Sequence, residues 1–287
     1  MRTVSESYGN GTVLCEVDRR GVATVTLNRP ERNNAYNGDV IGGLLEAFGR
    51  LGDDDAVRVV TIRGNGRHFQ AGADLGWLKE IGKLSPEENV VVSRRTASAI
   101  RGLTEFPKPT VALVHGGCFG GGTGIVAAAD VVIASEDAIF AITEARWGVM
   151  AGIIVPHLNA AIGVRNVRRY GLTCERFGAV EAQAMGLVHQ VCPEGGLDEA
   201  AAPVIDALLM SAPEATAQTK RRALIEAGLM LSDEHFEALL VEHSAKRQTD
   251  EAVEGLASFL EKRPPAWYPG RGLTPLSRAH SRVMSGR

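Results

Sequence analysis

The sequence predicts an α/β fold, because segments typical of strands alternate with segments typical of helices over the first two-thirds of its 287 residues. Apolar and polar residues alternate on both sides of residues 19–21, which is typical of a β-hairpin. Short apolar runs at residues 57–64, 110–117 and 131–135 are typical of buried strands. From Gly195 onward only helical patterns appear. We therefore expect an α/β core followed by a helical region.

The helices are predicted from the spacing of their apolar residues and from their first residues. Residues 37–51 carry apolar side chains at helical intervals and begin with an asparagine suited to capping a helix. Ser85 and Glu88 form a capping-box pattern, which starts a helix that runs to about Phe106. Four further helical blocks follow within residues 202–264.

Composition excludes several classes of protein. The net charge is −3 and no basic stripe is interleaved with aromatic residues, so we expect no nucleic-acid partner. The first eleven residues lack the apolar centre of a signal peptide, and no long apolar run occurs, so we expect a cytoplasmic protein without a membrane partner. The cysteines are too widely spaced for a zinc site and are expected to be reduced, with no metal bound: Cys15, Cys118, Cys174 and Cys192.

Six glycines lie within residues 116–124, directly after a predicted strand. Gly122, Gly124 and Ala127 match the G-x-G-x-x-A pattern of dinucleotide-binding folds. Fewer than ten residues separate Gly122 from the next predicted strand, whereas a crossover with its helix needs at least ~10–12 residues, which argues against that function. Two interpretations remain: a packing turn, or backbone N–H groups that face a small electron-rich group at a helix N-terminus.

Three loops that follow predicted strands are the candidate functional elements: residues 69–75, 115–124 and 141–148. Ligands of open α/β sheets bind at such strand ends. The first two loops are rich in Gly and Ala where a helix begins, so each can offer a bare backbone N–H, and two such donors make an oxyanion hole. Glu144 in the third loop has largely apolar neighbours, which favours a raised pKa and an acid–base role. The alternative is a glutamate that caps a helix or pairs with Arg146.

Other polar residues near these loops are expected to be structural. Asp74 is expected to cap the helix that follows it, and His115 and His157 are expected to be structural histidines. Cys118 lies in the glycine loop without an obvious paired base, which argues against a nucleophile.

The chain resembles the crotonase, or enoyl-CoA hydratase/isomerase, family from about Val13 to Tyr268. The resemblance lies in six stretches that occur in the family's order: VATVTLNRPERNNAYN, FQAGADL, PTVALVHGGCFGGGTGIVAAADVVIAS, AIFAITEARWGV, AVEAQAMGLVHQV and EGLASFLEKRPPAW. It implies an α/β, crotonase-like spiral of ββα units with a C-terminal helical trimerisation region, assembled as a homotrimer or a dimer of trimers. Residues 1–195 would form the core with the CoA and active sites, residues 196–268 the helical region, and residues 269–287 a flexible tail.

The resemblance also implies roles for individual residues. The N–H groups of Ala73 and Gly121 would hold the thioester oxygen of an acyl-CoA, and Glu144 would transfer the proton. The remaining residues implied to contact the substrate are Arg32, Asn33, Ala71 and Leu75 along the CoA arm, Lys262 at its nucleotide end, and Asp74, Gly120, Gly124 and Trp147. Coenzyme A would arrive as part of the substrate, with no separate cofactor.

One position departs from the family pattern. Hydratases with two glutamates carry an acid where this chain has Gly124, and only the second acid, Glu144, is retained. This argues against ordinary two-carboxylate hydration. The function expected is hydration of an α,β-unsaturated acyl-CoA of branched or glutaconyl type. The alternatives are a 3,2-enoyl-CoA isomerase that uses Glu144 alone and a CoA-thioester-binding protein without turnover.

Overall fold

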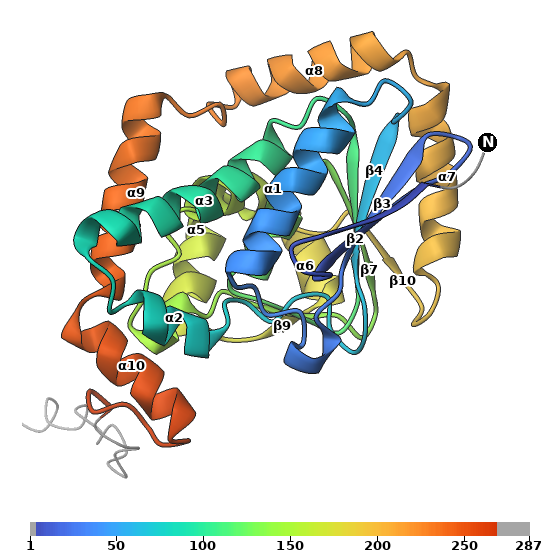
Figure 1. Cartoon of the computed structure of the whole chain (residues 1–287). Coiled ribbons are helices and arrows are strands. Elements are labelled where there is room, and N and C mark those ends of the chain that lie inside the picture. Colours follow the sequence, from blue (N-terminus) through green and yellow to red (C-terminus); the bar gives the residue numbers. More distant parts are fainter. Residues whose placement is uncertain (1–3, 269–287) are drawn as a thin grey trace, which may run out of the picture.

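A seven-stranded sheet with helices on both faces forms the centre of the computed structural model, which describes residues 4–268 (Figure 1). The strand order is β1-β2-β3-β4-β5-β7-β10, with β1 to β3 antiparallel and β3 to β10 parallel. These strands are β1 (Val4–Tyr8), β2 (Val13–Val17), β3 (Val22–Leu27), β4 (Val59–Gly64), β5 (Thr110–Val114), β7 (Val131–Ser135) and β10 (Gln190–Cys192). The predicted hairpin is β2–β3, and the edge strand β1 was not predicted.

A second, three-stranded sheet lies beside the glycine loop. It has the order β6-β8-β9, in which β6 and β8 are parallel and β9 is antiparallel to β8. Its strands are β6 (Gly117–Phe119), β8 (Ile139–Ala141) and β9 (Phe177–Gly178). This sheet holds the glycine loop against the segment that precedes Glu144.

The helices in chain order are η1 (Pro30–Arg32), α1 (Gly38–Asp53), α2 (Leu75–Ile81), α3 (Pro86–Thr104), α4 (Gly121–Ala128), η2 (Glu144–Trp147), α5 (Val155–Thr173), α6 (Ala179–Met185), α7 (Leu197–Met210), α8 (Pro213–Glu226), α9 (Asp233–Arg247) and α10 (Asp250–Leu260). The predicted helices are present, and the structure adds η1, η2, α5 and α6, which were not predicted. Asn37 caps α1 by accepting a hydrogen bond from the N–H of Val40, and the capping box of Ser85 and Glu88 is present at the start of α3.

The short helix α4 corrects one step of the sequence argument. The strands β5 and β7 are parallel neighbours, so residues 115–130 between them do form a crossover. Its length was underestimated because the chain first passes through β6 in the small sheet and only then enters α4. Eight helical residues suffice because the preceding residues already cover part of the distance.

Alternate residues of the buried strands face two separate apolar layers. In β5, Ala112 and Val114 join the main core with α1 and α3, whereas Val111 and Leu113 pack with residues of α7. Figure 1 shows α7 on the opposite side of the sheet from α1 and α3. This two-sided burial explains why the strand sequence is apolar throughout.

The C-terminal helices wrap around one end of the core. In Figure 1, α8 runs across the top of the molecule and links α7 on one side with α9 on the other. The helix α9 packs along α3, and α10 packs against η2 and α2. Among residues 4–268, no helix is long and apolar enough to cross a membrane. The predicted tail, residues 269–287, lies outside the described residues.

Asn34 ties the loop after β3 to the loop after β4. This side chain is 1% exposed and its amide donates to the carbonyls of Asn65 and His68, each at 2.8 Å. Its side-chain oxygen accepts from the N–H of Arg29 at 2.8 Å. The loops at these two strand ends are therefore fixed side by side, next to the site described below.

Candidate active site

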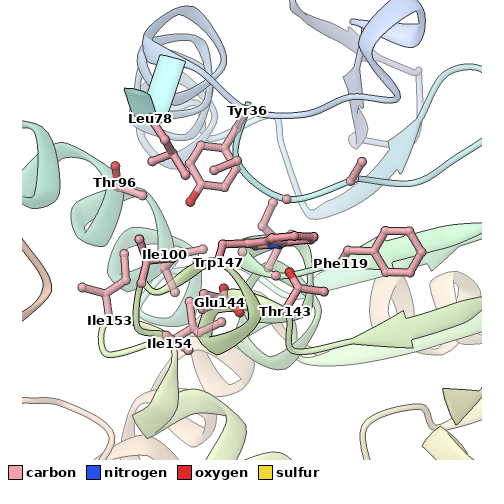
Figure 2. Close-up of a pocket in the computed structure, with 18 of the residues that line it drawn as sticks. Tyr36, Leu78, Thr96, Ile100, Phe119, Thr143, Glu144, Trp147, Ile153 and Ile154 are labelled. Atoms are coloured by element: carbon pink, nitrogen blue, oxygen red, sulfur yellow. The ribbon is translucent and has the colours of Figure 1, made fainter. Parts of the chain in front are cut away.

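A cavity of about 460 Å³ lies between the loops that follow the parallel strands and the helix α3. Its volume is in the range of small-molecule sites, and its walls are mostly apolar. Figure 2 shows Tyr36 with its hydroxyl directed into this space, across from Glu144 and Trp147. Contributing residues come from all three loops predicted at the sequence level.

Gln70 joins the loop after β4 to the glycine loop. Its N–H donates to the carbonyl of Gly117 at 3.1 Å, and its carbonyl accepts from the N–H of Phe119 at 2.9 Å. Its buried side chain accepts from the N–H of Gly72 at 2.7 Å. The loops consequently meet backbone to backbone: a Cβ on Gly72 would lie 3.2 Å from the carbonyl oxygen of Phe119.

The glycines are required by this close approach. A Cβ on Gly121 would lie 2.6 Å from the Tyr36 ring, and one on Gly122 would lie 2.7 Å from the Gln70 side-chain oxygen. Gly120 has a φ of +51°, a conformation that residues with a side chain rarely adopt. The glycine density thus allows the loop to reach both its neighbour and the cavity.

Two backbone N–H groups at this contact are free. Within residues 4–268, the N–H groups of Ala73 and Gly121 have no hydrogen-bond partner, and both residues line the cavity. Gly121 is the first residue of α4, where helix geometry leaves the N–H unpaired. The partial positive charge of the helix N-terminus adds to this donor.

Glu144 is the one carboxylate among the described residues that line the cavity. It is the first residue of η2, and its Oε1 would lie 3.2 Å from a Cβ on Gly120. The other oxygen, Oε2, is shielded from solvent and has no hydrogen-bond partner in the part of the chain that the structure describes. Burial raises the pKa of Glu144 to about 7, although the backbone N–H groups of Glu144 and Thr143 favour the charged form. Arg146 donates instead to the carbonyl of Thr173, so Glu144 is not paired with it.

Gly124 does not line the cavity. It is buried in α4, and a Cβ there would lie 2.3 Å from Cγ2 of Ile154 and 3.7 Å from Cδ1 of Ile100. Ile154 itself is 2% exposed and lines the cavity. The space beside position 124 is therefore filled by a hydrocarbon side chain.

The other predicted substrate contacts fall into two groups. Ala71, Leu75, Gly120 and Trp147 line the cavity. Those that do not line it are Arg32, Asn33, Asp74 and Lys262. Asp74 caps α2 through the N–H groups of Gly76 and Trp77 and pairs with Arg29 at 2.8 Å. Burial alone would raise the pKa of Asp74, but these contacts hold it below its usual value.

The two histidines have structural contacts, as expected, and Cys118 is buried. His157 is 4% exposed and contacts the Thr104 hydroxyl at 3.0 Å, and His115 contacts the carbonyl of Gly66 at 2.9 Å. Cys118 is fully buried, and burial raises the pKa of its thiol. Within residues 4–268, no group of His, Cys, Asp and Glu is placed to bind a metal ion.

Sequence reasoning did not single out several residues that line the cavity; four that matter below are Tyr36, His243, Arg247 and Phe259. Three of them belong to residues 196–268, so the cavity is not built by residues 1–195 alone. The Phe259 ring contacts Trp147 edge-on, with ring centroids 4.5 Å apart. No sequence signal pointed to Arg247, because the burial of its partners Asn89 and Ser93 on α3 is visible only in the structure.

Known proteins share the sequence pattern of this chain over most of its length. A sequence model of the family described as enoyl-CoA hydratase/isomerase matches residues 18–270. The chain is 35% identical over 192 residues to the hydroxycinnamoyl-CoA hydratase-lyase of Pseudomonas fluorescens, covering 66% of this chain and 69% of that protein. It is 28% identical over 271 residues to the peroxisomal Delta(3,5)-Delta(2,4)-dienoyl-CoA isomerase of Arabidopsis thaliana, covering 91% and 97%.

A solved structure extends the similarity to the fold. The crystal structure of an enoyl-CoA hydratase from Mycobacterium avium subsp. paratuberculosis K-10 matches 90% of this chain and 98% of that chain, at 30% identity and a TM-score of 0.79. Because the family model matches most of the chain and the fold is shared, the chain belongs to the enoyl-CoA hydratase/isomerase, or crotonase, family.

Proposed function

We propose that the protein adds water to the double bond of an α,β-unsaturated acyl-CoA, of branched or glutaconyl type. The Glu144 carboxylate takes a proton from water while the water oxygen bonds to the β-carbon. The N–H groups of Ala73 and Gly121 hold the negative charge that develops on the thioester oxygen. Protonated Glu144 then delivers the same proton to the α-carbon, which regenerates its carboxylate.

The observation that carries this proposal is the state of Glu144. Glu144 lines the cavity, its Oε2 is buried without a partner among residues 4–268, and its pKa is raised to about 7 by burial. A group with a pKa near the working pH can both accept and donate a proton efficiently. An unsatisfied buried carboxylate costs stability, so its retention favours a chemical role.

A second candidate is a 3,2-enoyl-CoA isomerase, in which Glu144 removes a proton from one carbon and returns it to another. It is favoured by the same observation that Glu144 is the single carboxylate lining the cavity among residues 4–268. Product analysis in deuterated water separates the two: hydration gives a β-hydroxyl and one deuterium at the α-carbon, whereas isomerisation moves the double bond and adds no hydroxyl. A CoA-thioester-binding protein would bind enoyl-CoA substrates and convert none of them.

The CoA arm is proposed to run past Arg32 and Asn33. The N–H of Ala71, which lines the cavity, donates to the carbonyl of Asn33 at 3.0 Å, so these segments form one surface. Lys262, just beyond α10, is proposed to meet the nucleotide end. Coenzyme A enters with the substrate, and we propose no further cofactor. The helices α7 to α10 are proposed to mediate a homotrimer or a dimer of trimers.

Replacing Glu144 by Gln should separate binding from chemistry. The amide is nearly isosteric, so acyl-CoA affinity should be retained, while turnover should fall by about 10²–10⁴-fold, as for the loss of a general acid–base group. Calorimetric titration and the absorbance of the conjugated thioester measure the two properties. The control is Glu136→Gln, an exposed carboxylate in the loop before β8, which should behave as wild type. Wild-type turnover in Glu144→Gln would refute the mechanism.

The raised pKa of Glu144 predicts opposite effects of pH on rate and on stability. Because the carboxylate is the active form, kcat/KM should rise as the pH passes about 7. The folded protein holds this proton more tightly than the unfolded chain, whose value is near 4.5, so its stabilising contribution is present below 4.5 and lost as the pH rises through 7. Urea unfolding should find the wild type losing roughly 3 kcal/mol relative to Glu144→Gln across this window. A constant difference would contradict the assignment.

The N–H of Gly121 can be tested with two variants that carry the same first side-chain atom. Gly121→Ala and Gly121→Pro both place a Cβ against Tyr36, but only proline removes the donor. The proline variant should therefore be slower than the alanine variant by about 10²–10³-fold. Circular dichroism and unfolding experiments on both proteins check that the fold is equally retained. Equal rates in the two variants would remove Gly121 from the oxyanion hole.

Restoring the second acid should require space that Ile154 now occupies. Gly124→Glu alone should be destabilised by at least ~1–3 kcal/mol, since its Cβ would overlap Ile154, and should gain no activity. Gly124→Glu combined with Ile154→Ala should hydrate crotonyl-CoA faster than Ile154→Ala alone. Thermal unfolding and crotonyl-CoA turnover measure these effects. A single Gly124→Glu protein with wild-type stability would show that the overlap is relieved in another way.

A further inference from the structure

A buried cation without an acidic partner lines the cavity. Arg247 is the last residue of α9 and is 4% exposed, yet it contributes to the cavity wall. Its hydrogen bonds go to three neutral side chains, and it forms no ion pair within residues 4–268. The other cavity-lining arginines, Arg146 and Arg176, are exposed to solvent. Burial of a charge without a counter-charge is costly, so this arginine needs an explanation.

The neighbours of Arg247 hold its guanidinium in one position. It donates to Oδ1 of Asn89 at 3.1 Å, to Oγ of Ser93 at 2.8 Å and to Nδ1 of His243 at 3.2 Å. Asn89 and Ser93 are four residues apart on α3 and are fully buried. His243 and Arg247 are four apart on α9, so each pair lies on the helix face that meets the other helix. The two polar pairs therefore meet within an otherwise apolar contact between α3 and α9, and they fix the position of the guanidinium.

This end of the cavity offers hydrogen-bond donors. A guanidinium has five N–H groups, and two of those of Arg247 have no acceptor among residues 4–268. His243 accepts at Nδ1, because arginine can only donate, so its neutral ring carries the proton on Nε2. Burial and the neighbouring Arg247 lower the pKa of His243 to about 3, which keeps the ring neutral. A ligand that fits these groups must supply acceptor atoms and negative charge.

A purely structural role does not account for the missing counter-charge. A cation at the C-terminal end of α9 is favoured by the helix dipole, and the hydrogen bonds of Arg247 join α9 to α3. The exposed pair of Arg94 and Glu237 joins the same two helices, with its charge neutralised. A residue that only joins α3 to α9 needs neither a buried charge nor a position in the cavity wall, and Arg247 has both.

Tyr36 relates this end of the cavity to the reacting end. Burial and the charge of Glu144 raise the pKa of the Tyr36 hydroxyl, whereas the charge of Arg247 opposes that rise. Both charges therefore act on one hydroxyl that Figure 2 shows pointing into the cavity. Glu144, Tyr36 and Arg247 thus line one cavity.

We propose that Arg247, held by Asn89 and Ser93, binds a carboxylate at the distal end of the acyl chain. The substrate class is then the CoA monothioester of an unsaturated dicarboxylic acid. Charge-assisted hydrogen bonds from the guanidinium N–H groups that have no acceptor among residues 4–268 would hold this carboxylate, whose charge is the missing counter-charge. The inference rests on the proposed function, since it places the reacting carbons at Glu144.

The test uses pairs of enoyl-CoA substrates with equal carbon number that end in either a carboxylate or a methyl group. The wild type should have the higher kcat/KM for the carboxylate member at the best chain length. Arg247→Met should lose about 30-fold or more on that member, mainly through KM, and change little on the methyl member. Arg247→Lys, which keeps the charge, should retain part of the preference. Arg94→Met, which removes the exposed bridge between the same helices, should leave the preference intact.

Two results would overturn the inference: a wild type that prefers the methyl member at every chain length, or an Arg247→Met protein that loses equally on both members. The first result is obtained with the wild type alone, so the inference can be refuted even if the Arg247→Met protein does not fold. Calorimetric binding of saturated carboxylate- and methyl-ended acyl-CoAs separates this inference from the proposed function. If no enoyl-CoA is converted but the carboxylate preference in binding depends on Arg247, the proposed function fails and the carboxylate site stands.

Discussion

The backbone hydrogen bonds of Gln70 hold the loop after β4 and the glycine loop so close together that Gly122 has no room for a side chain. The free N–H groups of Ala73 and Gly121 depend on this contact, because each lies next to a residue that takes part in it. The small sheet adds a second constraint, since the N–H of Gly120 donates to the carbonyl of Ala141 and so fixes the segment leading to Glu144. The donors and the acid are thereby positioned by backbone geometry, which varies little with side-chain motion.

The sequence predicted those elements whose signals are local. The capping box at Ser85 and the alternation in β2 and β3 report on neighbouring residues, and both are present. The strands β6, β8 and β9 have two or three residues each, too few for a periodic pattern, so their sheet could not be predicted. The crossover from β5 to β7 was misjudged for the same reason, because its path depends on the pairing of β6 with β8.

The site was predictable where its residues lie in the loops themselves. Ala73, Gly121 and Glu144 line one cavity, as the strand-end argument requires. Three of the missing residues, His243, Arg247 and Phe259, come from helices distant in sequence. Arg247 reaches the cavity only because α9 packs along α3. The overlap of Gly124 with Ile154 is also a tertiary fact, since the sequence alone shows a missing acid and not the side chain that fills its place.

Taken with the apolar walls, the two buried charges explain how one cavity can bind and react. Oε2 of Glu144 is shielded from solvent and Arg247 is 4% exposed, and each residue lacks a partner of opposite charge among residues 4–268. Both conditions lower stability in the empty protein, since charges away from water are compensated only by partners. A substrate with a negative charge at the end distant from its thioester would supply the counter-charge that Arg247 lacks. The burial of Glu144 raises its pKa to about 7, which suits an acid–base group at neutral pH. The fold thus keeps two destabilising groups where one ligand can meet both.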